Sequence, residues 1–298
     1  MLLLLWFEII IKMKKILYLI ITLFLVGCIS KQTTDKPVIA VTILPQKYFV
    51  EKIAGDFVQV YVIVPPGSSA ELYSPKPSQV KELASAKAWL VIGKMGFEES
   101  WRGKLKQNAP KTKVFDTSVQ TDWIAAEIVE HGDHVHMYGI DPHIWMAPNE
   151  VEQITTEILK VLTELFPDKK ETFNKNYQAF INEINELDTD LKAQLESLPN
   201  RKFLIFHPAL AYFARQYNLE QIAMEVDGKE PSARQMQDLV NLARHQNIKT
   251  IFIQKEFRTR NAELLSKEIN AKIVTIDPLA EDWNNQLREI AKKISAAE

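Results

Sequence analysis

The sequence predicts an α/β protein with two Rossmann-like lobes, each built on a parallel sheet, joined by one long α-helix. Short apolar segments with the period of buried strands alternate with amphipathic helices on both sides of residues 168–198. Residues 168–198 carry one continuous apolar stripe at helical spacing. The chain has 298 residues, 46% of them hydrophobic, which is enough to build two cores.

The amino terminus has the features of a bacterial lipoprotein signal peptide over residues 1–28. Three lysines precede the apolar run 16–26, which ends in Leu25-Val26-Gly27-Cys28. This run is shorter than the ~20 residues that a membrane-spanning helix needs, so it indicates a cleaved secretory signal. The final string resembles a lipobox, in which the cysteine is lipidated and becomes the first mature residue. We therefore expect Cys28 to anchor the protein, on the extracytoplasmic side, to a membrane of the cell envelope; the alternative is a cysteine that follows the run by chance.

Cys28 is the only cysteine in the chain. The exported protein is therefore expected to form no internal disulfide and to supply no thiolate to a metal. Glu8 interrupts the apolar residues before the lysines, which favours translation from Met13. The polar residues 29–36 are expected to form a tether.

Residues 37–167 are predicted to form the amino-terminal lobe. Strands are expected at 38–44, 58–64 and 88–92, and helices at 47–54, 77–86 and 149–166. Strands that alternate with helices in this way form a parallel sheet covered by helices.

The segment 168–198 is predicted to be a single linking helix. Its apolar side chains, from Phe173 to Leu198, recur at spacings of three and four, which draws one stripe along a helix about 45 Å long. One lobe does not need a helix of this length, so we interpret it as the connection between two lobes. The alternative is a long packing helix inside one domain.

Residues 199–298 are predicted to form the carboxyl-terminal lobe, in which the alternation resumes. Strands are expected at 202–206, 219–226, 250–253 and 272–276, and helices at 209–216, 232–245, 261–268 and 282–295.

Histidines are concentrated in one part of the chain, where four of the six lie within thirteen residues. Imidazole is the commonest protein ligand of transition metals near neutral pH. The first three, His131, His134 and His136 (the histidine tract), form an auxiliary metal site that captures ions transiently, or else belong to a solvated loop. The fourth stands in Asp141-Pro142-His143-Ile144-Trp145, and we interpret His143 as a metal ligand.

Two further candidates each follow a predicted strand directly and precede a proline, which fixes the turn. They are His207 and Asp277. The carboxyl ends of parallel strands form the edge at which open α/β sheets bind ligands. With His143 and an acidic residue from the loop after Val64, they give a set of nitrogen and oxygen ligands for a divalent cation.

Five motifs, in order along the chain, carry a resemblance to a known family. They lie at residues 66–78, 141–145, 207–213, 230–232 and 277–279. Over residues 37–298 the chain resembles the metal-binding lipoproteins of bacterial ABC importers, the zinc and manganese class, in which two α/β lobes are joined by one long helix. The resemblance implies a protein that captures a divalent metal between its lobes and delivers it to an ABC permease and its ATPase. We expect it to be a monomer.

The resemblance also implies the ligand set Glu71, His143, His207 and Asp277. Glu71 departs from the family, which usually has histidine at that position; the alternative is that Glu71 is a solvated loop residue and that water completes a three-residue site. Two carboxylates shift the preference somewhat towards manganese or iron, whereas His207 and the histidine tract favour zinc. We expect Zn²⁺ as the bound ion, with Mn²⁺ as the alternative.

Several other functions lack support in the sequence. A net charge of −2 gives no basic footprint for nucleic acid, and the glycine-rich nucleotide-binding signatures are absent. The motifs H-E-x-x-H and G-x-S-x-G are absent too, so we expect no enzyme, although a zinc ion with an open coordination position would activate water. An envelope adhesin remains the third alternative, and convergence of the predicted ligands would argue against it.

Overall fold

The computed structural model describes residues 36–131, 134–225, 229–257 and 260–296, with the backbone alone for 126–131 and 134–138. The predicted signal peptide, with Cys28, and the predicted tether up to residue 35 lie outside the described residues. From Pro37 onwards the chain forms one compact unit. In the described part of the chain, none of the helices combines the length and hydropathy that a membrane span requires.

The first sheet has four parallel strands in the order β2-β1-β3-β4. Its strands are β1 (Val38–Val41), β2 (Gln59–Val62), β3 (Ala88–Val91) and β4 (Lys113–Asp116). The helices that connect them are α2 (Leu44–Ala54), α3 (Pro77–Ser85) and α4 (Gly96–Asn108). All five elements predicted between residues 38 and 92 are confirmed, and α4 and β4 are additional.

The second sheet repeats this topology. Its strand order is β8-β7-β9-β10, again with the first strand in the chain between the second and the third. The strands are β7 (Lys202–Ile205), β8 (Glu220–Ala223), β9 (Thr250–Gln254) and β10 (Lys272–Ile276). The helices are α7 (Ala211–Gln216), α8 (Ala233–His245), α9 (Arg260–Ile269) and α10 (Trp283–Ser295). All the elements predicted here are confirmed.

In each sheet the chain order reverses beside the first strand, between β1 and β3 and between β7 and β9. Such a reversal opens a crevice at the carboxyl ends of the two strands, where α/β proteins bind ligands. In the first sheet the crevice holds the buried side chain of Glu98, which accepts hydrogen bonds from Thr42 Oγ1, from the amide of Ile92 (2.9 Å) and from that of Gly93 (2.7 Å). Burial raises the pKa of Glu98 to about 7, against the effect of these hydrogen bonds.

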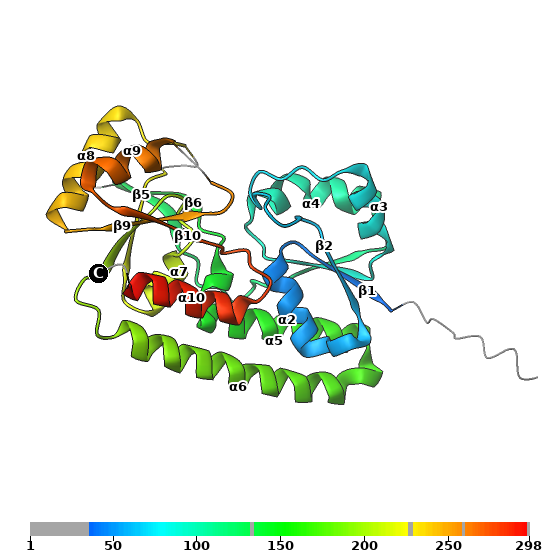
Figure 1. Cartoon of the computed structure of the whole chain (residues 1–298). Helices are drawn as coiled ribbons and strands as arrows, with labels where there is room; N and C mark the ends of the chain where they lie inside the picture. Colours follow the sequence, from blue (N-terminus) through cyan, green and yellow to red (C-terminus); the bar gives the residue numbers. More distant parts are fainter. Residues whose placement is uncertain (1–35, 132–133, 226–228, 258–259, 297–298) are drawn as a thin grey trace, which may run out of the picture. The chain divides into compact units, whose positions relative to one another are not determined.

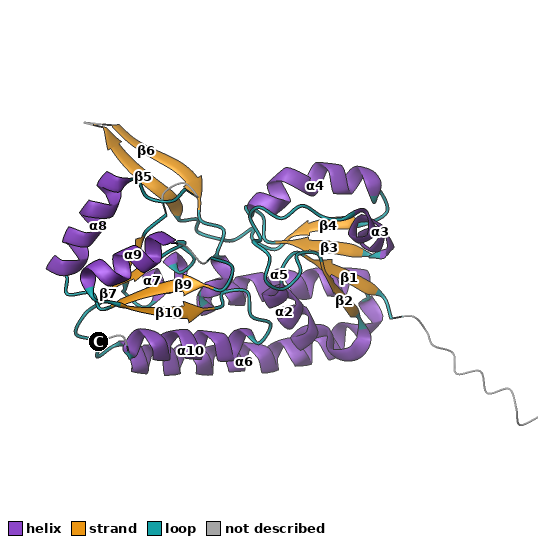
Figure 2. Ribbon diagram, turned by 45° about the horizontal axis from the view of Figure 1, so that its top comes forward, coloured by secondary structure: helices purple, strands orange, loops and turns teal. Residues whose placement is uncertain are grey.

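The histidine tract forms part of an antiparallel hairpin of β5 (Ala125–His131) and β6 (His134–Ile140). The hairpin is drawn apart from the two parallel sheets in Figure 2. Backbone pairing places His131 opposite His134 and Val129 opposite His136. The side chains of the tract lie outside the described residues, so its role as an auxiliary metal site stays a prediction.

The linking helix corresponds to α6 (Lys170–Leu195), which follows α5 (Pro148–Leu165) and the short 3₁₀ helix Pro167–Lys169. With 26 residues it is about 39 Å long. Its buried stripe consists of Phe173, Phe180, Ile184, Leu187, Leu191 and Leu195. In Figure 1 it runs beneath both sheets, packed against α2, α5 and α10. The predicted fold class is confirmed; the predicted lobe boundaries at 167 and 199 stay a prediction.

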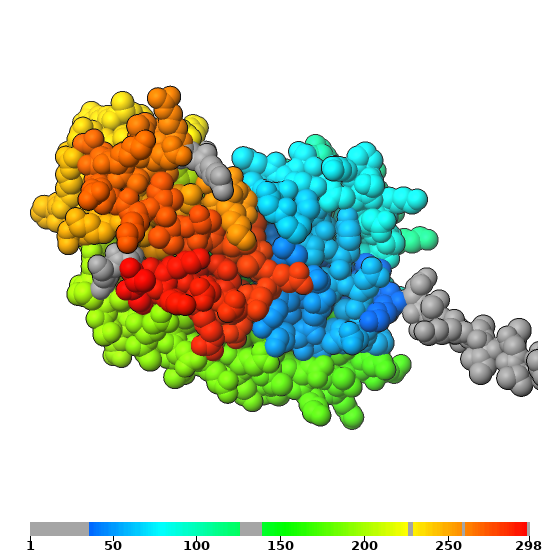
Figure 3. Space-filling view, in the orientation of Figure 1, coloured from blue at the N-terminus to red at the C-terminus, as the bar shows by residue number. Residues whose placement is uncertain are grey.

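One hydrophobic core continues from the first sheet into the second. Trp283 of α10 packs edge-on against Phe49 of α2 (5.3 Å between ring centroids) and Phe180 of α6 (6.5 Å). The inner face of the second sheet, with Phe203 and Ile205, belongs to the same core. A second cluster fills the space between that sheet and α8 and α9. Figure 3 shows the carboxyl-terminal segment (red) directly against the amino-terminal part of the first half (blue).

Candidate metal site

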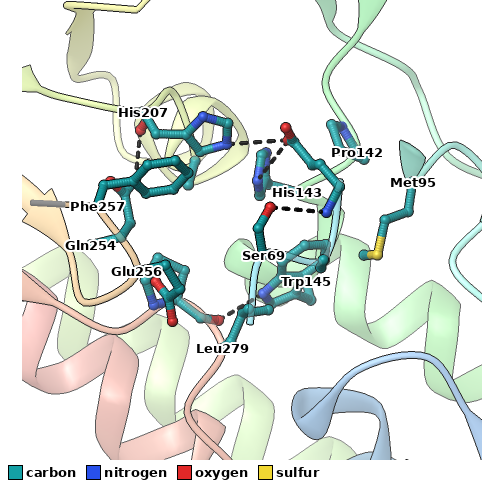
Figure 4. Close-up of a pocket in the computed structure, with 14 residues that line it drawn as sticks. Ser69, Met95, Pro142, His143, Trp145, His207, Gln254, Glu256, Phe257 and Leu279 are labelled. Atoms are coloured by element: carbon teal, nitrogen blue, oxygen red, sulfur yellow. Dashed lines mark hydrogen bonds and ion pairs between the residues drawn. The ribbon is translucent and has the colours of Figure 1, made fainter. Parts of the chain in front are cut away.

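Three of the four predicted ligands meet at one point. Glu71, His143 and His207 each offer one ligand atom, and these atoms lie within 4.8 Å of one another. Glu71 Oε1 is 3.1 Å from His207 Nε2 and 3.8 Å from His143 Nε2. Figure 4 shows the two imidazoles turned towards the same carboxylate. One carboxylate and two imidazoles in contact are a donor set that suits a divalent transition metal.

Glu71 lies in the loop that connects β2 to α3. Ser69 Oγ accepts hydrogen bonds from the amides of Glu71 (3.3 Å) and Leu72 (3.4 Å), which closes a tight turn. The turn rests on the start of α4: a Cβ added to Gly96 would lie 2.9 Å from the carbonyl oxygen of Glu71. Glycine at position 96 therefore allows the backbone of Glu71 to approach.

His143 is oriented by Asp141, two residues earlier. Asp141 Oδ1 accepts a hydrogen bond from the backbone amide of His143 and contacts its ring Nδ1, both at 2.8 Å. Because Nδ1 is bound to a carboxylate, Nε2 is the nitrogen that remains to bind a metal. The next turn, a 3₁₀ helix at Ile144–Met146, is fully buried.

His207 follows β7 and is oriented in the same way. Its Nδ1 contacts Glu225 Oε2 at 2.7 Å, and its ring stacks on Phe257 with 5.0 Å between centroids. Its main-chain carbonyl accepts a hydrogen bond from Gln254 Nε2 at 2.6 Å. Each imidazole thus has a carboxylate behind it, which fixes the tautomer and raises the basicity of the metal-binding nitrogen.

Asp277, the fourth predicted ligand, is placed elsewhere. Its carboxylate Oδ2 binds Lys255 Nζ at 2.6 Å and does not belong to the group of three. The residues that follow it, Pro278 and Leu279, line the cavity beside the group. The indole of Trp145 holds this loop in place by donating to the carbonyl of Pro278 at 2.8 Å. Ligation by Asp277 stays a prediction and requires the ion pair with Lys255 to open.

Comparison with known proteins agrees with this geometry. Residues 39–297 match the family described as zinc-uptake complex component A, periplasmic. The chain belongs to this family. Its members are metal-binding transport proteins that work outside the cytoplasm, which confirms the resemblance seen in the motifs and agrees with the expectation of no enzyme.

Individual members of the family are similar to this chain over most of its length. The zinc-binding lipoprotein AdcA of Streptococcus pneumoniae is 30% identical over 280 residues, which cover 90% of the chain and 56% of AdcA. The chain thus spans about half the length of that relative. A crystal structure of ZnuA is 41% identical, with a TM-score of 0.83, and the match covers 88% of this chain and 99% of that one. A zinc-bound deletion mutant of ZnuA is 40% identical, with a TM-score of 0.80, covering 88% and 98%.

Glu71 and His207 shift each other's pKa in opposite directions. Burial lowers the pKa of His207, but hydrogen bonds and attraction from Glu225 and Glu71 outweigh it and raise that pKa to about 9. Burial raises the pKa of Glu71, but the hydrogen bond with His207 and the charges of His207 and His143 outweigh it, so the net pKa is lowered. The raised pKa of His207 thus reflects the two carboxylates that lie on either side of its ring.

The cavity beside the three side chains has a volume of about 40 Å³. It is lined by Ser69, Ala70, Glu71, Met95, Pro142, His143, Trp145, His207, Ala209, Gln254, Glu256, Phe257, Pro278 and Leu279. A water molecule needs roughly 10–15 Å³ of such volume, so the space suits one ion with one or two waters.

Residue patterns did not indicate the contacts that orient His143 and His207, which come from Asp141, Glu225 and Gln254. Glu225 lies two residues after β8 and Gln254 ends β9. The rule that singled out His207, a polar residue at the carboxyl end of a strand, also applies to Gln254. The predicted strand 219–226 hid Glu225, because it ran past the true end of β8 at Ala223.

Proposed function

We propose that this protein captures Zn²⁺ outside the cytoplasm and delivers it to an ABC permease that is driven by an ATPase. The observation that carries the proposal is the convergence of Glu71, His143 and His207, each buried or half-buried. Their loops come from both halves of the molecule, so a bound ion links the two sheets. The family, and the zinc named for AdcA and for the ZnuA deletion mutant, support zinc as the cargo.

The ligands we propose are Glu71, His143 and His207, with Asp277 as a fourth when it releases Lys255. Cys28 carries the lipid that anchors the protein, which acts as a monomer. The histidine tract supplies an auxiliary site from which zinc passes to the main one. Manganese is the second candidate cargo, because a site with Glu71 and Asp277 holds two hard carboxylates. An adhesin is not favoured, since adhesion does not need a buried cluster of three ligands.

The test is a competition titration of the chain beginning after Cys28, with zinc and manganese each competing against a chromophoric chelator. We expect one zinc ion per chain at the main site, bound more tightly than manganese, because the auxiliary site captures ions only transiently. Glu71→Ala should lose at least tenfold in affinity, whereas Glu82→Ala, an exposed carboxylate on α3, should not change it.

The possible results separate the candidates. Tight manganese with weak zinc would change the cargo to manganese. Binding of neither metal would refute capture, and equal binding by wild type and Glu71→Ala would refute this ligand set.

A further inference from the structure

Gln254 has a buried polar atom that nothing in the described part of the chain satisfies. The residue ends β9 and is 2% exposed. Its Nε2 donates to the carbonyl of His207 at 2.6 Å, whereas its Oε1 is buried without a hydrogen-bond partner among the described residues. Buried acceptors are nearly always paired, so this atom needs an explanation.

The orientation of this side-chain amide is fixed by chemistry. The carbonyl of His207 can only accept a hydrogen bond, so the amide nitrogen must face it. Exchanging the two ends of the amide would bring two acceptors together at 2.6 Å. The oxygen is therefore the polar atom of Gln254 that remains for the contents of the cavity (Figure 4).

Gln254 borders the same cavity as the three converging ligands. Its strand, β9, lies beside β7, so Gln254 and His207 flank the crevice at the point where the strand order reverses. Glu256 lines the cavity two residues further on and is a second acceptor. The cavity of about 40 Å³ leaves room, beside a cation held by Glu71, His143 and His207, for one or two waters next to Gln254 and Glu256.

The two hydrogen-bond acceptors, Gln254 and Glu256, lie where a water molecule bound to the cation would need them. A divalent cation polarises its water, which becomes a strong donor whose hydrogens need acceptors. We propose that Gln254 is a further cargo-binding residue: its Oε1 accepts a hydrogen bond from a water molecule bound to the captured cation, and Glu256 accepts the second hydrogen of that water. This inference rests on the proposed function, because it requires a cation at Glu71, His143 and His207.

Gln254→Met tests the proposal, since methionine keeps the length of the side chain and removes both polar ends. Gln46→Met is the matched control: Gln46 is also buried and donates Nε2 to a carbonyl, that of Leu90 at 3.2 Å. Its Oε1, however, accepts from the amides of Thr42 and Ile43. Residues that support metal ligands typically change affinity by about 10–100-fold. We expect Gln254→Met to lose about tenfold in zinc affinity and Gln46→Met to stay within twofold.

A second measurement separates water binding from mere support of His207. In the cobalt-loaded protein, the visible d–d absorption changes as the bound water ionises. A hydrogen-bond acceptor that stabilises the neutral water opposes this ionisation. Gln254→Met should therefore shift the pH midpoint of the absorption change to lower pH. An unchanged midpoint would overturn the proposal even if affinity fell, because a structural role alone predicts that result.

The failure of this proposal is distinguishable from failure of the proposed function. Zinc binding by the wild type tests the function, and the ratio of variant to wild type tests Gln254; a ratio within twofold refutes its role. If Gln254→Met does not fold, a zinc-loaded crystal structure of the wild type decides. A water that contacts both the ion and Oε1 supports the proposal, and an ion without such a water overturns it.

Discussion

The hydroxyl group of Tyr212 donates a hydrogen bond to the main-chain carbonyl of Asp141 across 3.0 Å. It also accepts one from the amide of Ile124, again at 3.0 Å. Tyr212 is fully buried on α7, five residues after His207, and Asp141 is the residue that orients His143. The segment that begins with His207 therefore braces the loop that presents His143.

Tyr212→Phe should weaken both folding and zinc binding. It leaves the amide of Ile124 without its partner, which costs roughly 1–3 kcal/mol of unfolding free energy. Because the loop of Asp141 loses its brace, zinc affinity should fall several-fold. Urea denaturation of the metal-free protein and chelator competition measure the two effects.

Tyr217→Phe is the control. The hydroxyl of Tyr217 binds Asp188 on α6, 3.0 Å away, so the substitution should reduce stability and leave zinc affinity unchanged. Equal affinity losses in both variants would contradict the bracing role.

Glu225→Ala should reduce zinc affinity by about 10–100-fold, because the carboxylate behind His207 orients the ring and raises its basicity. Glu225→Gln should lose less, since its amide oxygen still accepts from Nδ1. Glu220→Ala, at the start of the preceding strand β8, removes only a surface ion pair with Lys202 and serves as the control. The dissociation constants from competition titration decide; an Ala variant that binds like wild type would show that Glu225 does not support the ligand.

The metal-free protein should lose stability as the pH rises from about 6.5 to about 9. The pKa of His207 is raised from 6.5 to about 9 in the folded protein. The folded state therefore binds more protons in this window, so the contribution is complete below about 6.5 and is lost through about 9. It amounts to something on the order of 3 kcal/mol.

Zinc should remove this dependence, since the ion replaces the proton on His207. The comparison is made by denaturation at several pH values, with and without zinc. The raised pKa of Glu98 contributes to both curves alike, so their difference isolates the metal site. Parallel curves for the two forms would show that no proton is displaced.

Asp277→Asn tests the fourth predicted ligand. If Asp277 ligates the ion, the variant should lose at least tenfold in zinc affinity, and Lys255→Ala should bind zinc more tightly because no ion pair has to open. Both constants come from the same competition assay. A change of less than twofold in Asp277→Asn would leave the site with three protein ligands.

Residue patterns predicted the helices and strands whose buried side chains recur with a regular period. They missed the elements that lack such a period. Strands such as β3, buried along its whole length, and the stripe of α6 were found within a few residues. Helix α4 was missed because Gly96 and Gly103 and several charges obscure its period, and the edge strand β4 is short and half-buried. The three residues that converge could be named in advance, Glu71 and His143 from motifs and His207 also from a strand end. The contacts of Glu225 and Gln254 could not, because they depend on which strands are neighbours.

The two sheets have the same strand order, but their crevices differ in what lies between the strands. In the first sheet, Glu98 from the chain itself fills the position between β1 and β3 and takes up the free hydrogen-bond donors there. In the second, His207 and Gln254 leave the equivalent position open towards the cavity. The crevice of the first sheet is thus filled by a carboxylate of the chain itself, whereas the crevice of the second sheet borders the cavity beside Glu71, His143 and His207. Equal topology therefore does not give equal binding sites: we expect a single ion, beside the second crevice, with Glu71 from the first half completing its site.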